Sequence, residues 1–171
     1  EEGELSLAYA GVRFRQGKLL DTLEWAHRAE RLAREIDDPQ MLAHASYLLM
    51  IGYGVLRRPE VVKYRELPLR LFEELGDLVG QANVLNNLGV EAHDESRWSE
   101  ALDYYERSRL ARDEAGDVIG AATAANNIAE ILSDQGHLDD AEALFDQALR
   151  AWRRAGYEVG VAVGTAYLGR L

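Results

Sequence analysis

The sequence predicts an all-α fold, a solenoid of stacked helical hairpins with about four and a half repeats. Three observations predict it. Small and turn-forming residues recur with a 40-residue period along the chain. Within each repeat the apolar residues step by three and four, as one face of an α-helix does. No segment alternates apolar and polar residues over the length of a β-strand. Because a repeat of this length forms one supersecondary unit, we expect a single array over residues 1–171.

The 40-residue period is clearest in the second half of the chain. Gly76-Asp77 recurs as Gly116-Asp117, and Asn86-Asn87-Leu88-Gly89 recurs as Asn126-Asn127-Ile128-Ala129. Aligning 76–115 with 116–155 gives ten identical positions. Residues 36–75 are a weaker copy, and Gly17 to Asp21 resembles Gly136 to Asp140. The expected repeats are approximately 1–36, 37–75, 76–115, 116–155 and the partial 156–171.

Turn-forming and capping residues predict helix boundaries in several repeats. Gly17 suits the turn inside the first hairpin, as Gly136 does in the fourth. Asp21 with Glu24, and Asp139 with Glu142, have capping-box spacing for second helices. Pro39 and Pro59 suit first helical turns.

The second helix of the second repeat is predicted to be irregular. Pro68 falls inside it, where proline removes a hydrogen bond and clashes with the preceding turn. We expect a kink or break near residues 64–68, and a tolerated irregularity is favoured over a functional hinge.

The third and fourth repeats show the helical faces directly. Residues 118–134 are rich in alanine, which favours helix and lets neighbouring helices approach closely. Gly76, Gly116 and Gly156 suit left-handed helix ends. The second helices carry one apolar face each, formed by Ala101, Tyr104, Tyr105, Ser108 and Ala111, and by Ala141, Leu144, Phe145, Ala148, Trp152 and Ala155.

This pattern resembles the tetratricopeptide repeat (TPR). That family has a small residue late in the first helix, alanine early in the second and an aromatic residue four positions later. The matching residues are Leu88-Gly89, Ala101 and Tyr105, then Ile128-Ala129, Ala141 and Phe145, with Leu168-Gly169 in the fifth repeat. The common form of the repeat is shorter, with a length of about 34 residues. The 40-residue form resembles TPR regions of bacterial signalling proteins, namely class III adenylate and guanylate cyclases and large ATPase-type transcription activators.

The resemblance implies a right-handed superhelix whose concave groove is lined by the first helix of each repeat. In such proteins the array binds or senses, while chemistry or DNA contact resides in other domains. The groove residues implied for this chain are Tyr47, Met50, Tyr53, Asn83, Asn86, Asn87, Val90, His93, Thr123, Asn126, Asn127, Glu130, Asp134, Tyr167 and Arg170.

These groove residues indicate the kind of partner. TPR domains that grip a chaperone's carboxylates use Lys and Arg, whereas the matching positions here are amide, aromatic and acidic. Asparagine has both a donor and an acceptor and can bond the backbone of an extended peptide. The alternative is that one asparagine of each pair forms hydrogen bonds with backbone groups of the neighbouring repeat. The sequence leaves both the peptide-binding and the inter-repeat interpretation open. Tyr47 and Tyr53 are also candidates for lining a peptide site, and the sequence leaves this open as well.

Composition excludes several other functions. The net charge of −11 argues against nucleic-acid binding, which needs clustered Lys and Arg. The absence of cysteine excludes disulfides and thiolate metal sites, with a mild preference for a cytoplasmic location. No apolar run is long enough to span a membrane. The four histidines are scattered, and His93-Asp94-Glu95 diverge around a helix, so we predict no metal, no cofactor and no catalytic residue.

The favoured function is therefore a non-catalytic protein–protein interaction module, a regulatory fragment of a larger bacterial signalling protein. The alternative is a small-molecule-sensing domain of a transcription activator, favoured if a pocket forms near Tyr47, Met50, Asn86 and Asn87. Neither the partner nor the parent protein follows from the sequence.

The two ends of the chain suggest a fragment. Glu1 is not a start methionine, and the chain stops at Leu171 without the polar capping helix that repeat arrays normally need. We expect the apolar flank formed by Val161, Val163, Tyr167 and Leu168 to be covered by missing sequence, by another domain or by self-association with another copy.

Overall fold

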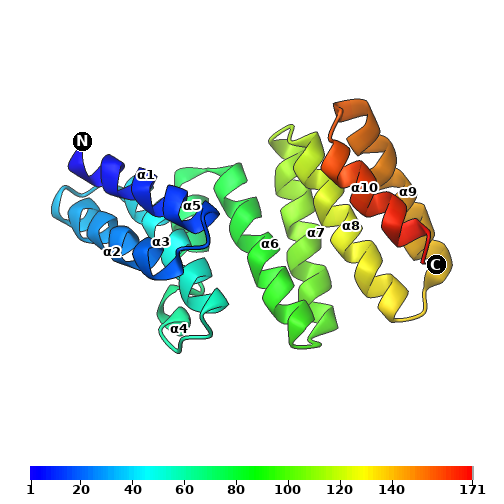
Figure 1. The fold of residues 1–171 in the computed structure, drawn as a ribbon, viewed down its shortest axis with the longest axis horizontal. Helices are drawn as coiled ribbons and strands as arrows, with labels where there is room; N and C mark the ends of the chain where they lie inside the picture. The colour runs from blue at the N-terminus through cyan, green and yellow to red at the C-terminus, as the bar shows by residue number, and fades with distance from the viewer. Residues whose placement is uncertain (171) are drawn as a thin grey trace. The chain divides into compact units, whose positions relative to one another are not determined.

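The computed structural model describes residues 1–170, which form helices joined by short turns, with no strand in that range. The predicted all-α fold is confirmed (Figure 1). Leu171, the last residue of the expected fifth repeat, lies outside the described residues. The helices are α1 (Glu2–Arg15), α2 (Leu19–Glu35), α3 (Pro39–Val55), α4 (Val61–Tyr64), α5 (Leu67–Leu75), α6 (Leu78–Asp94), α7 (Trp98–Glu114), α8 (Val118–Asp134), α9 (Leu138–Ala155) and α10 (Glu158–Leu168).

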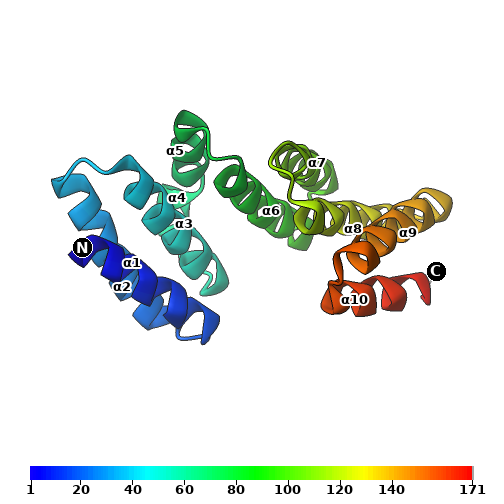
Figure 2. The same ribbon diagram turned by 90° about the horizontal axis from the view of Figure 1, so that it is seen from above.

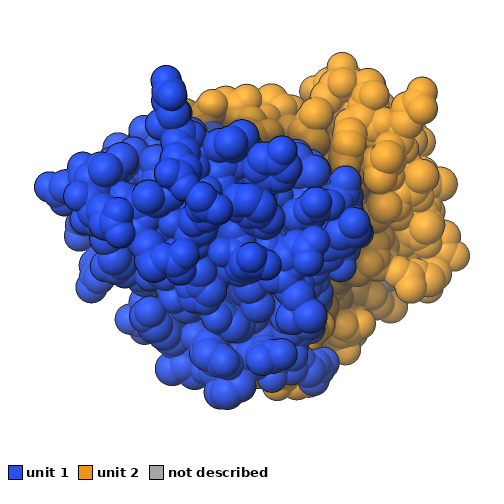
Figure 3. All heavy atoms as spheres, turned by 60° about the vertical axis from the view of Figure 1, so that its left-hand side comes forward, with its two compact units in different colours: residues 1–84 blue, residues 85–171 orange. Residues whose placement is uncertain are grey.

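The chain divides into two compact units, coloured separately in Figure 3. Unit 1 is Glu1–Val84 and unit 2 is Leu85–Leu171, so the division falls within α6. Unit 1 contains α1 to α5 and the start of α6, and unit 2 contains the rest of α6 and α7 to α10.

Small residues make up much of the unit 1 core. Helix α2 packs against α1 and α3, and α3 also packs against α5 (Figure 2). Ala26 and Ala29 on α2 are fully buried, so the neighbouring helices approach closely. Leu49 of α3 and Phe72 of α5 fill the larger spaces and are buried as well.

The predicted break at Pro68 is confirmed. Helix α4 ends at Tyr64 and α5 begins at Leu67, so Pro68 lies in the first turn of α5. In that position the missing N–H of proline costs nothing, because no carbonyl of the helix would accept from it. Pro39 likewise opens α3 as expected. Pro59 was expected in a first turn but lies in the turn before α4.

In unit 2 the hairpins close over small residues of the first helix. Ala129 of α8 packs with Ala141 and Phe145 of α9. At the matching position in the previous hairpin, a Cβ built on Gly89 would lie 2.6 Å from ring carbons of Tyr105. Both hairpins therefore place an aromatic ring directly on the first helix, as the sequence resemblance implied.

Helix boundaries correct one expectation and confirm another. Asp21 and Asp139 do not cap their helices, because α2 and α9 begin earlier, with Lys18 and His137 at the N-cap and no side-chain cap. The capping carboxylates belong instead to first helices, where Asp38, Asp77 and Asp117 accept from the backbone N–H three residues on. Gly76 and Gly156 end α5 and α9 with φ of 66° and 67°, the left-handed conformation that favours glycine.

None of the described helices combines the length and the apolar character needed to cross a lipid bilayer.

Candidate interaction surface

The first helices of unit 2 are joined through their asparagines. Asn127 Nδ2 of α8 donates to Asn86 Oδ1 of α6 at 3.1 Å. Both side chains are half-buried. The bond uses one of the two amide hydrogens of Asn127 and the carbonyl of Asn86. Of the two interpretations that the sequence left open, this contact supports an inter-repeat role for these two side chains, while their other polar groups can still bond a partner.

A second polar pair lies further along the same two helices. His93 Nε2 lies 3.3 Å from Asp134 Oδ2, and the two residues are 41 positions apart, as Asn86 and Asn127 are. Glu130 lies one turn before Asp134 on α8 and is half-buried. Burial raises the pKa of Glu130, and the nearby charge of Asp134 adds to this, while His93 and Arg170 oppose it. This part of unit 2 is an acidic and amide-rich surface.

Asn126 does not lie on an accessible surface, contrary to the prediction. Its residue is 4% exposed, and its buried Oδ1 has no hydrogen-bond partner. The residue 41 positions later is Tyr167, whose ring stacks on Phe145 with 5.0 Å between centroids. Asn86 accepts a hydrogen bond from the amide of Asn127, 41 positions later. Asn126 accepts no such bond, because the residue 41 positions after it is a tyrosine and has no amide side chain.

The other predicted residues of unit 2 are at least partly accessible. Val90 is 41% exposed. Asn87, Thr123 and Tyr167 are half-buried, and the Thr123 hydroxyl donates to Ile119 O within α8. Arg170 is exposed, and its guanidinium lies 4.4 Å from the ring centroid of Tyr167, a cation–π contact.

In unit 1 the predicted residues have mixed positions. Tyr47, Tyr53 and Asn83 are half-buried. Met50 is 4% exposed and belongs to the core, which corrects its expected place in the groove. The reason is that Leu49, Met50 and Ile51 are all buried, so α3 is covered on several sides and not along a single stripe.

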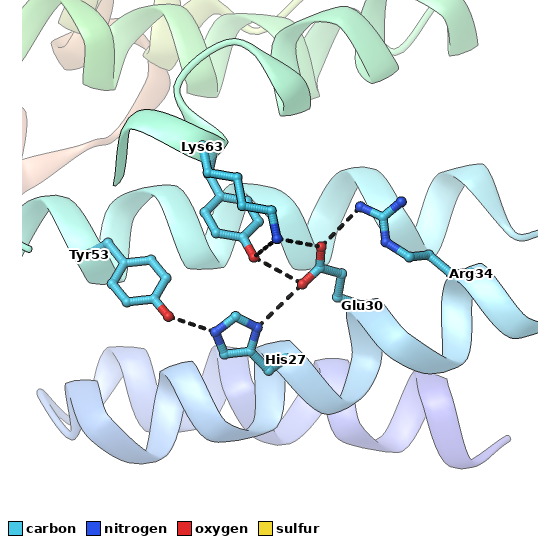
Figure 4. A network of polar contacts seen from close by, with 6 residues as sticks. His27, Glu30, Arg34, Tyr53 and Lys63 are labelled. Atoms are coloured by element: carbon cyan, nitrogen blue, oxygen red, sulfur yellow. Dashed lines mark hydrogen bonds and ion pairs between the residues drawn. The ribbon is translucent and has the colours of Figure 1, made fainter. Parts of the chain in front are cut away.

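Sequence reasoning missed a polar network in unit 1, centred on Glu30 of α2 (Figure 4). Glu30 Oε1 accepts from Arg34 at 3.0 Å, and Oε2 accepts from the Tyr64 hydroxyl at 3.0 Å. His27 Nδ1 lies 3.3 Å from Glu30 Oε2, and His27 Nε2 lies 2.6 Å from the Tyr53 hydroxyl. Lys63 Nζ donates to Tyr64 at 3.0 Å. A neutral His27 that donates from Nδ1 and accepts at Nε2 satisfies both contacts.

The network keeps the Glu30 carboxylate charged inside the protein. Burial of Glu30 opposes ionisation, but hydrogen bonds from Arg34, Tyr64 and His27 outweigh it and lower the pKa of Glu30. Burial raises the pKa of Tyr64, which stays protonated and donates. The signal in the sequence was His27, Glu30 and Arg34 on one face of α2, at spacings of three and four residues. The network connects the short helix α4 to α2, so the role of the network is structural.

Among residues 1–170, no group of three or more His, Asp or Glu side chains has the arrangement of a metal site.

Comparison with known families identifies the repeat. A family model described as tetratricopeptide repeat matches residues 121–155. This segment is therefore similar to a tetratricopeptide repeat. This segment contains the Ala129, Ala141 and Phe145 contact described above. No curated protein sequence matches the chain.

Solved structures show that TPR-type architecture extends through the chain. Aspartyl phosphate phosphatase F from Bacillus subtilis matches with a TM-score of 0.89 and 15% identity over 96% of this chain and 44% of that protein. A Rap protein complexed with Competence and Sporulation Factor matches with a TM-score of 0.85 and 14% identity over 96% and 47%. A Podosopora anserina protein assigned as a kinesin light chain, with nearly identical TPR-like repeats, matches with a TM-score of 0.68 and 11% identity. The match covers 90% of this chain and 77% of that protein. The chain spans less than half the length of the first two proteins.

Proposed function

We propose that this chain is a non-catalytic module that binds a protein segment, in extended conformation, on the first-helix surface of unit 2. The observation that carries the proposal is the Asn86–Asn127 contact, which places two amides side by side at 3.1 Å on adjoining first helices. After this bond, the amide N–H groups of Asn86 and the carbonyl of Asn127 match the alternating carbonyl and N–H groups of a peptide backbone.

The charge of the same surface defines the partner further. Glu130 and Asp134 follow Asn127 along α8, and desolvation of Glu130 makes a cationic neighbour favourable there. We therefore infer that the bound segment carries Lys or Arg near the Glu130 end. The proposed binding residues of unit 2 are Asn86, Asn87, Val90, His93, Thr123, Asn127, Glu130 and Asp134.

We also propose partner contacts for the other accessible residues of the predicted groove. Tyr47, Tyr53 and Asn83 in unit 1 are partly accessible, as are Tyr167 and Arg170 of unit 2. Met50 and Asn126 are left out because both are 4% exposed. We also propose a cytoplasmic, regulatory role in a larger bacterial signalling protein, such as a nucleotide cyclase or a transcription regulator. The structure of a Rap protein complexed with Competence and Sporulation Factor supports binding of a partner by this fold.

Small-molecule sensing is the weaker alternative. The two hollows described in unit 2, of about 460 and 210 Å³, are lined by none of the predicted groove residues. An open surface of amides and carboxylates suits a peptide better than it suits a metabolite that must be enclosed.

Selection from a random peptide library tests the proposal. Selected peptides should be extended and basic, and Asn127→Ala or Glu130→Gln should weaken their binding about tenfold, equivalent to the loss of one or two hydrogen bonds. Gln147→Ala is the matched control, because Gln147 is an exposed amide on the second helix α9. Selected peptides whose affinity is unchanged by Asn127→Ala and Glu130→Gln would contradict the proposal, as would failure to select any.

A further inference from the structure

Helix α10 is the last described helix of unit 2 (Figure 1). An uncovered groove lies along it, where it meets the end of α9. It encloses a hollow of about 460 Å³. Its lining residues are Arg153, Gly156, Glu158, Val161, Ala162 and Thr165. None of them belongs to the surface proposed for peptide binding, so a role for this groove is independent of that function.

The preceding repeat shows what normally fills such a groove. One sequence period before Val161, Ala162 and Thr165 lie Ala121, Ala122 and Ala125 of α8. These three line a smaller hollow of about 210 Å³, whose other walls are formed by Gln147, Ala148 and Ala151 of α9 and by Arg109 and Asp113 of α7. The two hollows are thus equivalent places in successive repeats, and the earlier one is closed by a helix with small side chains.

Exposure confirms that the later groove lacks such a helix within residues 1–170. Ala122 and Ala125 are 5% and 3% exposed, whereas Ala162 and Thr165 at the matching positions are exposed. Val159 is 64% exposed and Val163 is 39% exposed on the same helix. Neither valine lines the hollow, but an apolar helix with this much exposed surface is characteristic of an interface.

The side chains of helix α10 suit it to pack against a second copy of itself. Between Glu158 and Arg170 the chain has no charged residue, and Ala162, Thr165 and Ala166 give it a small exposed face like that of α9 in the preceding groove. The two ends have opposite charge. In an antiparallel pair, Glu158 of one copy lies near Arg170 of the other, and the same contact is repeated by symmetry.

We propose that the groove on α10 is a homodimer interface, in which α10 of a second copy occupies the place that α9 takes beside α8. The pair would form one antiparallel hairpin shared between two chains. Contacts between small side chains permit close approach of the helix axes. Thr165 lies near the two-fold axis, because it is within one residue of the midpoint between Glu158 and Arg170.

Sedimentation equilibrium of the full chain over a wide concentration range tests this proposal. We expect a reversible monomer–dimer equilibrium. Ala162→Arg should raise the dimer dissociation constant at least about tenfold, because a charged side chain would be forced into the apolar groove. Ala143→Arg is the matched control, since Ala143 is an exposed alanine of α9 outside the groove, and it should leave the constant unchanged. Circular dichroism of each variant checks that helix content is kept.

A charge exchange tests the antiparallel arrangement. Glu158→Arg and Arg170→Glu should each weaken the dimer, and the double variant should recover part of the loss because the pair is restored in reversed order. Because the chain has no cysteine, Thr165→Cys should also cross-link specifically under mild oxidation, whereas Ala143→Cys should not.

Two results would overturn the proposal. A chain that stays monomeric at every concentration would assign the groove to a helix other than α10 of a second copy. A dimer that is insensitive to Ala162→Arg and to Thr165→Cys cross-linking would place the interface elsewhere.

Discussion

Asn127 donates a hydrogen bond to Asn86 at 3.1 Å, and the two residues are 41 positions apart, one more than the sequence period. His93 and Asp134 keep the same separation. Adjoining first helices of unit 2 are therefore offset by one residue where they meet. The two asparagines of a pair are consequently not equivalent, because the first of one pair meets the second of the next.

The first prediction concerns the strength of this contact. Asn86→Ala and Asn127→Ala should show a coupling of about 0.5–1.5 kcal/mol in a double-mutant cycle, the usual net value of one hydrogen bond. The free energy of unfolding, measured by urea denaturation of both single variants and the double variant, gives this number. Purely additive effects would show that the bond contributes nothing to stability.

The second prediction concerns Gly89. Alanine in place of glycine inside a helix normally stabilises it by about 1 kcal/mol. Here the new Cβ would lie 2.6 Å from the ring of Tyr105, which is 2% exposed and has little room to move. We expect Gly89→Ala to destabilise unit 2 by about 1–3 kcal/mol, the usual cost of overpacking. Thermal or urea unfolding measures the change.

The control for Gly89→Ala is the same substitution in a variant that lacks the Tyr105 ring. In a Tyr105→Leu background the ring is absent, so the added methyl group of Gly89→Ala should cost much less. If Gly89→Ala is equally destabilising with and without the Tyr105 ring, the close approach is not the cause.

The period of the sequence was sufficient to predict the helical hairpins, because the residues that repeat are those that pack or turn. Phe145 on Ala129 and the left-handed Gly156 follow directly from it. Helix starts were harder. Asp21 has the spacing of a cap, but α2 begins at Leu19, and a residue pattern does not indicate where the first helical turn forms. Asp77 and Asp117 repeat with the period and are the actual caps.

The candidate surface could be predicted only in part. A helical pattern tells which residues share a face, but a first helix contacts its own second helix and also the first helices of adjoining repeats. Asn126 and Met50 are buried for this reason, although each lies on the predicted face. The Glu30 network was missed because its partners Tyr53 and Tyr64 come from α3 and α4, far along the chain.

The third prediction tests the packing of the fourth repeat. Ala141 is fully buried against Ala129 and Phe145. Ala141→Leu should therefore cost about 1–3 kcal/mol, because the added carbons have no space between α8 and α9. Ala143→Leu, two residues along α9 and exposed, should change the free energy of unfolding very little. Equal effects of the two substitutions would mean that helix propensity, and not packing, determines the result.

The fourth prediction concerns the pH dependence of unit 1. Hydrogen bonds hold the pKa of Glu30 below its ordinary value of 4.5 in the folded chain. A carboxyl whose folded pKa is lowered contributes stability above the unfolded pKa, and that contribution is lost as pH falls through the folded pKa. Glu30→Gln should therefore destabilise the protein by about 1–3 kcal/mol at neutral pH, because a buried charged hydrogen-bonding partner is lost.

The difference between wild type and Glu30→Gln should shrink as the pH falls from 4.5 through the lower folded pKa. In that range the carboxyl of the unfolded chain takes up a proton before the folded one does, which favours unfolding of the wild type. Urea unfolding at a series of pH values from neutral to acidic measures the difference. Glu24→Gln is the matched control, since Glu24 is exposed on the same helix and should show a small difference at every pH. A difference for Glu30→Gln that is constant with pH would show that the Glu30 charge does not stabilise the network.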